Sequence, residues 1–220
     1  YQRALIRHCG EDDKLLIGSK GTQYNQGASG VKWETEGAWS TGVNPSDSGD
    51  ISVNAESGWI YVAYRSGVVS GYNHITNEYA SNLTGKACAV GSKYVVVSDY
   101  SGNSPASVYE VGTNNLVASL NAPTGVQAWG GWAYSKNDLA TNGDVVIVTG
   151  RSGNSCTGYV YDMASSSPTT IRKQFYVSTG ASNNMSPPYI EVSANSEVLQ
   201  FGFTNATITQ GPVDAIVTPN

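Results

Sequence analysis

The sequence is poor in charge and contains no long apolar run. Only 13% of its 220 residues are charged, and the formal net charge is −5. A protein that binds nucleic acid needs a basic surface, so we expect no nucleic-acid partner. No stretch approaches the roughly 20 apolar residues of a membrane helix, which predicts no membrane insertion. Ser, Thr, Asn and Gly must therefore supply most of the polar surface.

Cysteine and histidine are also scarce. The three cysteines, Cys9, Cys88 and Cys156, are far apart and odd in number. They form neither a disulfide framework nor a C-x-x-C zinc or redox site, and at most one disulfide is expected. His8 and His74 each stand alone, which is more typical of hydrogen-bonded scaffold residues than of ligands or bases. We expect no metal and no cofactor.

One segment, residues 138–144, has a faint likeness to a calcium loop. It supplies oxygen ligands and a glycine, but it lacks the alternating acids and the closing glutamate of such a loop. An Asn-Gly hairpin turn is the simpler interpretation.

Tyrosine and tryptophan are abundant, with 14 Tyr and five Trp against three Phe. This usage is typical of β-rich proteins. Residues 58–75 show the pattern best, because two apolar-aromatic runs, 59–64 and 68–75, flank a glycine-containing turn and read as a hairpin. Runs at 50–54 and 79–83 complete a four-stranded antiparallel unit. No segment has convincing helical periodicity.

The same unit recurs along the chain. Its most regular strand starts at Leu15, Trp59, Tyr94, Val145 and Val198, at intervals of 44, 35, 51 and 53 residues. Repeats of about 40–50 residues with four short strands each are typical of a β-propeller. The sequence predicts one all-β domain, residues 1–220, with five blades at 1–44, 45–85, 86–123, 124–180 and 181–220. A β-sandwich or jelly roll is the alternative.

Three of the copies, residues 59–72, 94–109 and 145–161, also resemble a known repeat. They are similar to the repeat of the YVTN or NHL-like propellers, in which a buried strand ends in a polar turn before a V-x-V-Y/W strand. The resemblance implies the fold and no particular activity. A five-bladed protein of this size is similar to tachylectin-type lectins and to five-bladed glycosidases, but the near-identical sugar-site repeats of the lectins are missing.

The most distinctive stretch is the Trp-Gly-Gly-Trp-Ala-Tyr segment at residues 129–134. Its rings flank a Gly pair in the longest irregular connection and could face a sugar or a partner protein, with nearby polar side chains orienting it. The alternative is that both indoles wedge between blades as core. The predicted ligand-binding residues are Trp129, Trp132, Tyr134, Asn137 and Asp138.

A catalytic centre is not expected. A propeller glycosidase needs carboxylates from the inner strands of separate blades. Asp50 and Glu191 lie near first strands, but the first and third copies carry Arg-His-Cys and Ala-Cys-Ala at 7–9 and 87–89. The chain is therefore predicted not to be an enzyme.

Three function hypotheses follow. The first is a non-catalytic extracellular recognition or adhesion module that binds glycans or a surface protein. The second is a self-assembling structural protein of a virion, filamentous appendage or surface layer, and the third is a five-bladed glycoside hydrolase. The expected location is extracellular, or at a virion or cell surface. Possible glycosylation sites, if the chain is secreted by a eukaryote, are Asn82, Asn184 and Asn205.

Overall fold

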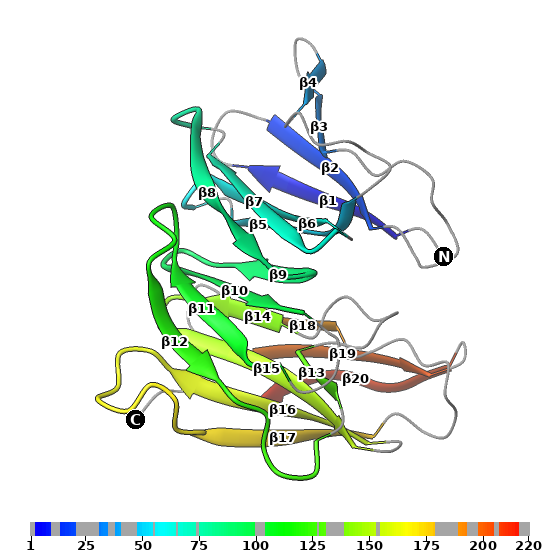
Figure 1. Cartoon of the computed structure of the whole chain (residues 1–220). Helices are drawn as coiled ribbons and strands as arrows, with labels where there is room; N and C mark the ends of the chain where they lie inside the picture. The colour runs from blue at the N-terminus through cyan, green and yellow to red at the C-terminus, as the bar shows by residue number, and fades with distance from the viewer. Residues whose placement is uncertain are drawn as a thin grey trace.

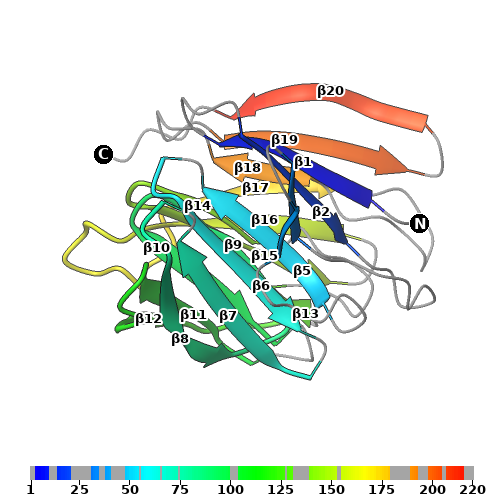
Figure 2. The same cartoon turned by 90° about the horizontal axis from the view of Figure 1, so that it is seen from above.

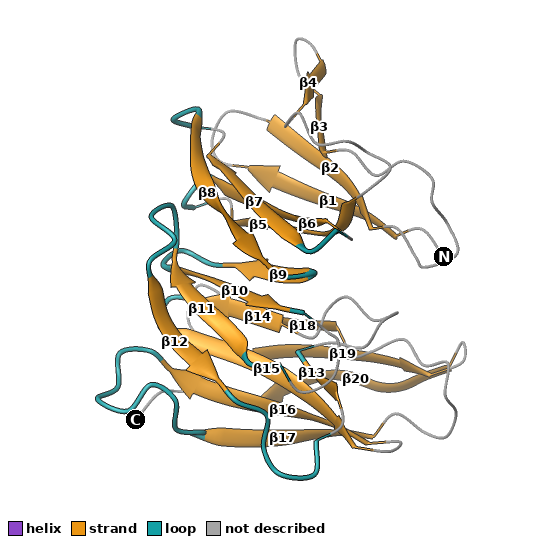
Figure 3. Cartoon of the chain, viewed as in Figure 1, coloured by secondary structure: helices purple, strands orange, loops and turns teal. Residues whose placement is uncertain are grey.

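The computed structural model contains only β-strands, turns and connecting segments (Figure 3). It describes residues 3–9, 14–20, 31–34, 38–40, 48–54, 56–64, 66–73, 75–99, 104–126, 128–130, 139–152, 155–178, 189–192, 198–204 and 207–215. Side-chain surroundings are described mainly between residues 52 and 174. Within these ranges no helix has the length and apolarity of a membrane span. The all-β prediction is confirmed.

The strands form antiparallel sheets that follow one another along the chain (Figure 1). The first sheet contains β1 (Arg3–Cys9), β2 (Lys14–Lys20), β3 (Val31–Glu34) and β4 (Ala38–Ser40). The second contains β5 (Ser48–Asn54), β6 (Trp59–Tyr64), β7 (Val68–Asn73) and β8 (Glu78–Thr84). The third contains β9 (Ala87–Val90), β10 (Tyr94–Ser98), β11 (Ala106–Glu110) and β12 (Leu116–Leu120). In each of these sheets every strand pairs with the next one along the chain.

The last two sheets depart from four strands. The fourth contains β13 (Ala128–Trp129), β14 (Leu139–Asn142), β15 (Val145–Ser152), β16 (Ser155–Asp162) and β17 (Lys173–Ser178), with β13 and β14 both paired to β15. The fifth contains β18 (Tyr189–Val192), β19 (Val198–Thr204) and β20 (Thr207–Ala215). The sequence predicts two strands at 207–209 and 213–217, whereas the structure has a single strand over 207–215; residues 216 and 217 lie outside the described residues. The sequence also misses β14.

Neighbouring sheets meet through one set of strands, which includes β5, β9, β14 and β18. β5 contacts β1 and β2 of the sheet before it and β9 of the sheet after it, and β14 contacts both β9 and β18. Figure 2, which views the molecule from above, shows β5, β9, β14 and β18 on successive sheets. Each of these contacts therefore joins two sheets that follow one another along the chain.

The core lies between sheets that pack face to face. β10 contributes to two of these layers, because Val95 and Val97 face the second sheet whereas Val96 faces the fourth. β15 does the same, with Val146 and Val148 in the layer shared with the third sheet and Ile147 in a cluster that reaches Val192 of β18. Strands buried on both faces read as continuous apolar runs. β10 and β15 are therefore strands that other sheets cover on both faces.

Candidate functional site

The two faces of the second sheet have different surroundings. One face, here called the core face, packs on the third sheet around Cys88, Val90, Val95 and Val97. The other, here called the groove face, lies on the side where Figure 1 draws the first sheet. The core face consists of Trp59, Tyr61, Ala63, Val69 and Leu83. The groove face consists of Ile60, Val62, Tyr64, Ser70, Tyr72, Tyr79 and Asn82.

A turn of the third sheet closes the outer end of the core face. The Tyr61 hydroxyl donates to Asn114 Oδ1 at 2.7 Å and accepts the Gly112 N–H at 3.1 Å. The Asn114 amide in turn donates to the Ser81 carbonyl of β8. Gly112 has a φ of 82°, and a Cβ there would lie 2.8 Å from the Trp59 ring. The turn can approach this closely only because it carries a glycine.

Burial strongly shifts the pKa of the Tyr61 phenol. Its side chain is 0% exposed, and this desolvation raises the pKa of the phenol to about 12, although the bond from Gly112 opposes the shift. The phenol is therefore neutral and fixed. The core face offers no open polar group to a ligand at this position.

The groove face holds a pocket of about 190 Å³. Ile60 and Val62 form its apolar floor and are 1% and 2% exposed. Tyr64, Ser70, Tyr72, Tyr79 and Asn82 line the rest, together with Gly71 and Ala80. A concave site with an apolar floor and a few polar groups is the usual form of a small-ligand site.

A pair of tyrosines forms one wall of this groove. The Tyr72 and Tyr79 ring centroids are 4.8 Å apart with a 49° tilt, and the Tyr72 hydroxyl donates to Asn77 Oδ1 at 2.7 Å. Asn77 occupies the turn before β8 with a φ of 60°, a conformation that asparagine tolerates better than most residues. Tyr72 is thus held, whereas Tyr79 is 70% exposed. An aromatic ring placed in this way can present one face to a ligand.

A β-bulge brings the polar part of the groove into place. β7 and β8 pair Gly71 with Ala80 and Val69 with Leu83, so Ser81 and Asn82 together oppose Ser70. The extra residue turns Asn82 to the groove face, where its Oδ1 accepts the Ser70 hydroxyl at 2.8 Å. In the described part of the chain no other group bonds to the Asn82 amide. Bulges of this kind often re-aim a side chain beside a functional site.

Trp129, predicted to be an exposed binding residue, lies in the core. It is 1% exposed, its Nε1 donates to the Leu120 carbonyl at 2.7 Å, and its ring centroid is 5.2 Å from that of Tyr159. Gly130 is glycine for a local reason, since its φ is 65° and a Cβ would lie 2.6 Å from the Ser98 Cβ. The expectation of an exposed platform is therefore wrong at this residue.

The other predicted site residues, Trp132, Tyr134, Asn137 and Asp138, lie outside the described residues, and their role stays a prediction. The same holds for glycosylation at Asn184 and Asn205. Asn82 is exposed on β8 and lines the groove. Of the three cysteines, Cys88 is buried and forms no disulfide, and its Sγ donates to the Tyr61 carbonyl at 3.5 Å.

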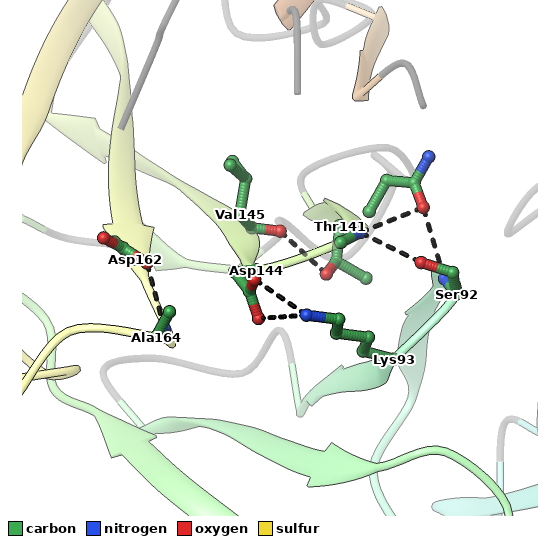
Figure 4. Close-up of polar contacts among 9 residues, drawn as sticks. Ser92, Lys93, Thr141, Asp144, Val145, Asp162 and Ala164 are labelled. Carbon is green, nitrogen blue, oxygen red and sulfur yellow. Dashed lines mark hydrogen bonds and ion pairs between the residues drawn. The ribbon is translucent and has the colours of Figure 1, made fainter. Parts of the chain in front are cut away.

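A second polar cluster joins two turns of the third and fourth sheets (Figure 4). Lys93 Nζ donates to both carboxylate oxygens of Asp144 at 2.9 and 2.8 Å, and this bond raises the pKa of the lysine. The Ser92 N–H donates to Asn142 Oδ1 at 3.2 Å, and the Gly143 N–H donates to Ser92 Oγ at 3.2 Å. These contacts satisfy turn backbone groups and cross-link two sheets.

The turn interpretation of residues 138–144 is thereby confirmed at the Asn-Gly pair, where Gly143 has a φ of 54°. On the same hairpin the Thr141 hydroxyl donates to the Val145 carbonyl at 2.8 Å, and Asp162 Oδ1 accepts the Ala164 N–H at 3.0 Å. Among the described residues, no three His, Cys, Asp or Glu side chains lie close enough together to hold a metal ion.

Two solved structures share this arrangement of strands. One is the Kluyveromyces lactis Hsv2 structure with its complete loop 6CD, with 9% identity and a TM-score of 0.50, and the match covers 92% of this chain and 57% of that one. The other is the computationally designed Ika8 protein, with 14% identity and a TM-score of 0.55, covering 90% of this chain and 54% of that one. The chain spans little more than half the length of each. At such identities the likeness concerns the fold alone.

No protein-family model matches the sequence, and no curated protein matches it.

Proposed function

We propose that the chain is a β-propeller of five blades that acts as a non-catalytic recognition module at an extracellular, virion or cell surface. The blade arrangement is supported by the order of the contacts, because β5, β9, β14 and β18 of four successive sheets touch one another in turn. It is also supported by the third sheet, which is covered on both faces by different sheets. A two-sheet sandwich has no such middle layer.

The recognition role rests on one observation, the exposed Tyr79 ring in an otherwise well-packed sheet. Tyr79, on the groove face of β8, is 70% exposed beside the apolar floor of the pocket. Tyr61, on the core face of β6, is 0% exposed. A tyrosine ring that contacts one neighbouring ring, here Tyr72 at 4.8 Å, and is open to solvent on its other side is typical of residues that dominate binding. The partner in this proposal is a glycan or a surface protein.

The test is a binding screen of the whole chain against immobilised glycans and extracellular surface proteins, with Tyr79→Ala beside the unmodified protein. Binding that the variant loses, without release of any cleaved product, supports the proposal. Turnover of a glycan would overturn the non-catalytic part of it. Equal binding by both proteins would place recognition elsewhere on the chain.

A structural role is the second candidate, and the outer strand β12 favours it. Leu116 and Val117 on this strand are 60% and 39% exposed, and β12 carries no charged residue or proline. Exposed apolar edge strands without such residues can pair with another copy. The test is sedimentation at increasing concentration, where self-assembly should be weakened by Leu116→Lys and left unchanged by Tyr79→Ala. A monomer at every concentration would overturn this candidate.

A further inference from the structure

The part of the groove lining that the structure describes carries no charged side chain. It consists of aliphatic, aromatic, hydroxyl, amide and glycine groups, without Lys, Arg, Asp or Glu. The neighbouring acid on β8, Glu78, accepts the Thr76 hydroxyl at 2.9 Å. A charged ligand would lose hydration on entering such a groove and find no opposite charge there. The lining therefore favours an uncharged ligand group.

The size of the groove limits the ligand further. Its volume of about 190 Å³ is below the roughly 300–1,000 Å³ of pockets that enclose drug-sized molecules. Only one ring-sized group fits, with the remainder of a larger ligand outside. The Tyr79 ring stands at the edge of this space and rests on Tyr72 at 4.8 Å, so it can contact a ring lying in the groove without first becoming ordered.

The polar groups of the groove complement hydroxyl groups. Asn82 uses its carbonyl oxygen to accept the Ser70 hydroxyl, and its amide nitrogen can still donate two hydrogen bonds to a ligand. The Ser70 oxygen keeps lone pairs that accept a ligand O–H. An aromatic side chain of a protein partner would satisfy the apolar floor but not these groups. A nucleotide would bring phosphate to a chain of net charge −5.

We propose that the groove binds one uncharged pyranose unit of a glycan, with a face of the sugar on Tyr79 and its hydroxyl groups bonded by Asn82 and Ser70. This inference rests on the proposed recognition function and specifies its ligand. The C–H face of a pyranose provides the apolar contact that a tyrosine ring accepts, and the sugar's equatorial hydroxyls project toward the sides where the amide and the hydroxyl lie.

The experiment titrates the intact chain with two sets of monosaccharides and follows saturation-transfer NMR signals. The neutral set is glucose, galactose, mannose and N-acetylglucosamine, and the acidic set is glucuronic acid and sialic acid. Tyr79→Ala, Tyr79→Phe and Asn82→Ala are compared with Leu116→Ala, which removes a similarly exposed apolar side chain from the outer strand of the next sheet. Melting curves verify that each variant is folded.

The expected result is binding of at least one neutral sugar. Tyr79→Ala should weaken it about tenfold or more and Asn82→Ala about fivefold, and Tyr79→Phe, which keeps the ring, should weaken it less than Tyr79→Ala. Leu116→Ala should stay within about twofold. Binding of acidic sugars alone, or of a protein from the surface screen alone, that still depends on Tyr79 would overturn the assignment to an uncharged pyranose and leave the recognition function standing. Sugar binding that is equal in Tyr79→Ala and the unmodified chain would overturn both at this groove.

Discussion

The core face and the groove face of the second sheet are built from the same three strands, yet only one of them is closed. On the core face, Tyr61 and Asn114 fix a turn of the third sheet over the outer end of the junction. On the groove face, Tyr72 is bound to Asn77 of its own hairpin, and Tyr79 is left 70% exposed. The difference is that the core face is covered at its outer end by another sheet, whereas the groove face keeps one large aromatic ring exposed to solvent.

The largest contrast is expected from a buried charge. Ala63, on the core face, is 0% exposed, so Ala63→Asp would place an unpaired carboxylate among apolar groups. The expected cost is about 3–5 kcal/mol against a total stability of about 5–15 kcal/mol. Asn82→Asp, the matched change on the groove face, keeps the charge in solvent and should cost far less. Urea unfolding of both variants measures this, and equal midpoints would contradict the assignment of the two faces.

A smaller contrast is expected from removing one hydroxyl on each face. Tyr61→Phe leaves the Gly112 N–H and Asn114 without their partner in a buried setting, which should cost about 1–3 kcal/mol. Tyr79→Phe removes the same atom from an exposed ring and should leave the stability unchanged. Thermal unfolding of the pair gives the difference. A loss as large in Tyr79→Phe would mean that the exposed ring is part of the core.

The pKa of Tyr61 makes the core face sensitive to alkali. Burial raises the pKa of the Tyr61 phenol from its ordinary 10.0 to about 12 in the folded protein. The unfolded chain therefore loses this proton first as the pH rises. The contribution of the neutral phenol to the free energy of unfolding is complete below about pH 10. Up to about 2 kcal/mol of it is lost between pH 10 and 12. Unfolding free energies measured across that range should decline less steeply in Tyr61→Phe. Parallel profiles for the two proteins would count against a buried neutral phenol.

The smallest effect is expected for the ring that carries the recognition proposal. Tyr79→Ala should change stability by no more than about 0.5 kcal/mol, because the side chain is largely exposed and the sheet below it is complete. Chemical denaturation of this variant provides the measurement. A loss of several kcal/mol would show that Tyr79 holds the sheet together and is not reserved for a ligand.

Much of the fold could be predicted because its strands carry their own signal. Val95, Val96 and Val97 read as a strand covered on both faces, and the structure places them in two core layers. β14 was missed because Thr141 and Asn142 make it look like a polar loop. Both are buried, and bonds to the Val145 carbonyl and to the Ser92 backbone satisfy them. Partners of this kind are not visible in a local pattern.

The candidate site was harder to predict for the same reason. Trp129 was predicted to be an exposed platform because the glycine pair after it suggested a flexible connection. In the structure, a hydrogen bond to the Leu120 carbonyl and a contact with the Tyr159 ring hold its indole in the core. In the sequence, Tyr79 looked like an ordinary aromatic residue of a β-strand. A usable signal was present in the count of residues between Ala80 and Leu83, which is one more than the regular pairing with β7 allows.

That single extra residue also has an evolutionary consequence. A slip of the whole strand would exchange its two faces and destroy the core, whereas the bulge changes the direction of the chain at Ser81 and Asn82 alone. Substitutions at positions 70, 79 and 82 can therefore be sampled without repacking any layer of the molecule. A lineage, or a library randomised at these three positions, could move from one ligand to another while its scaffold stays the same.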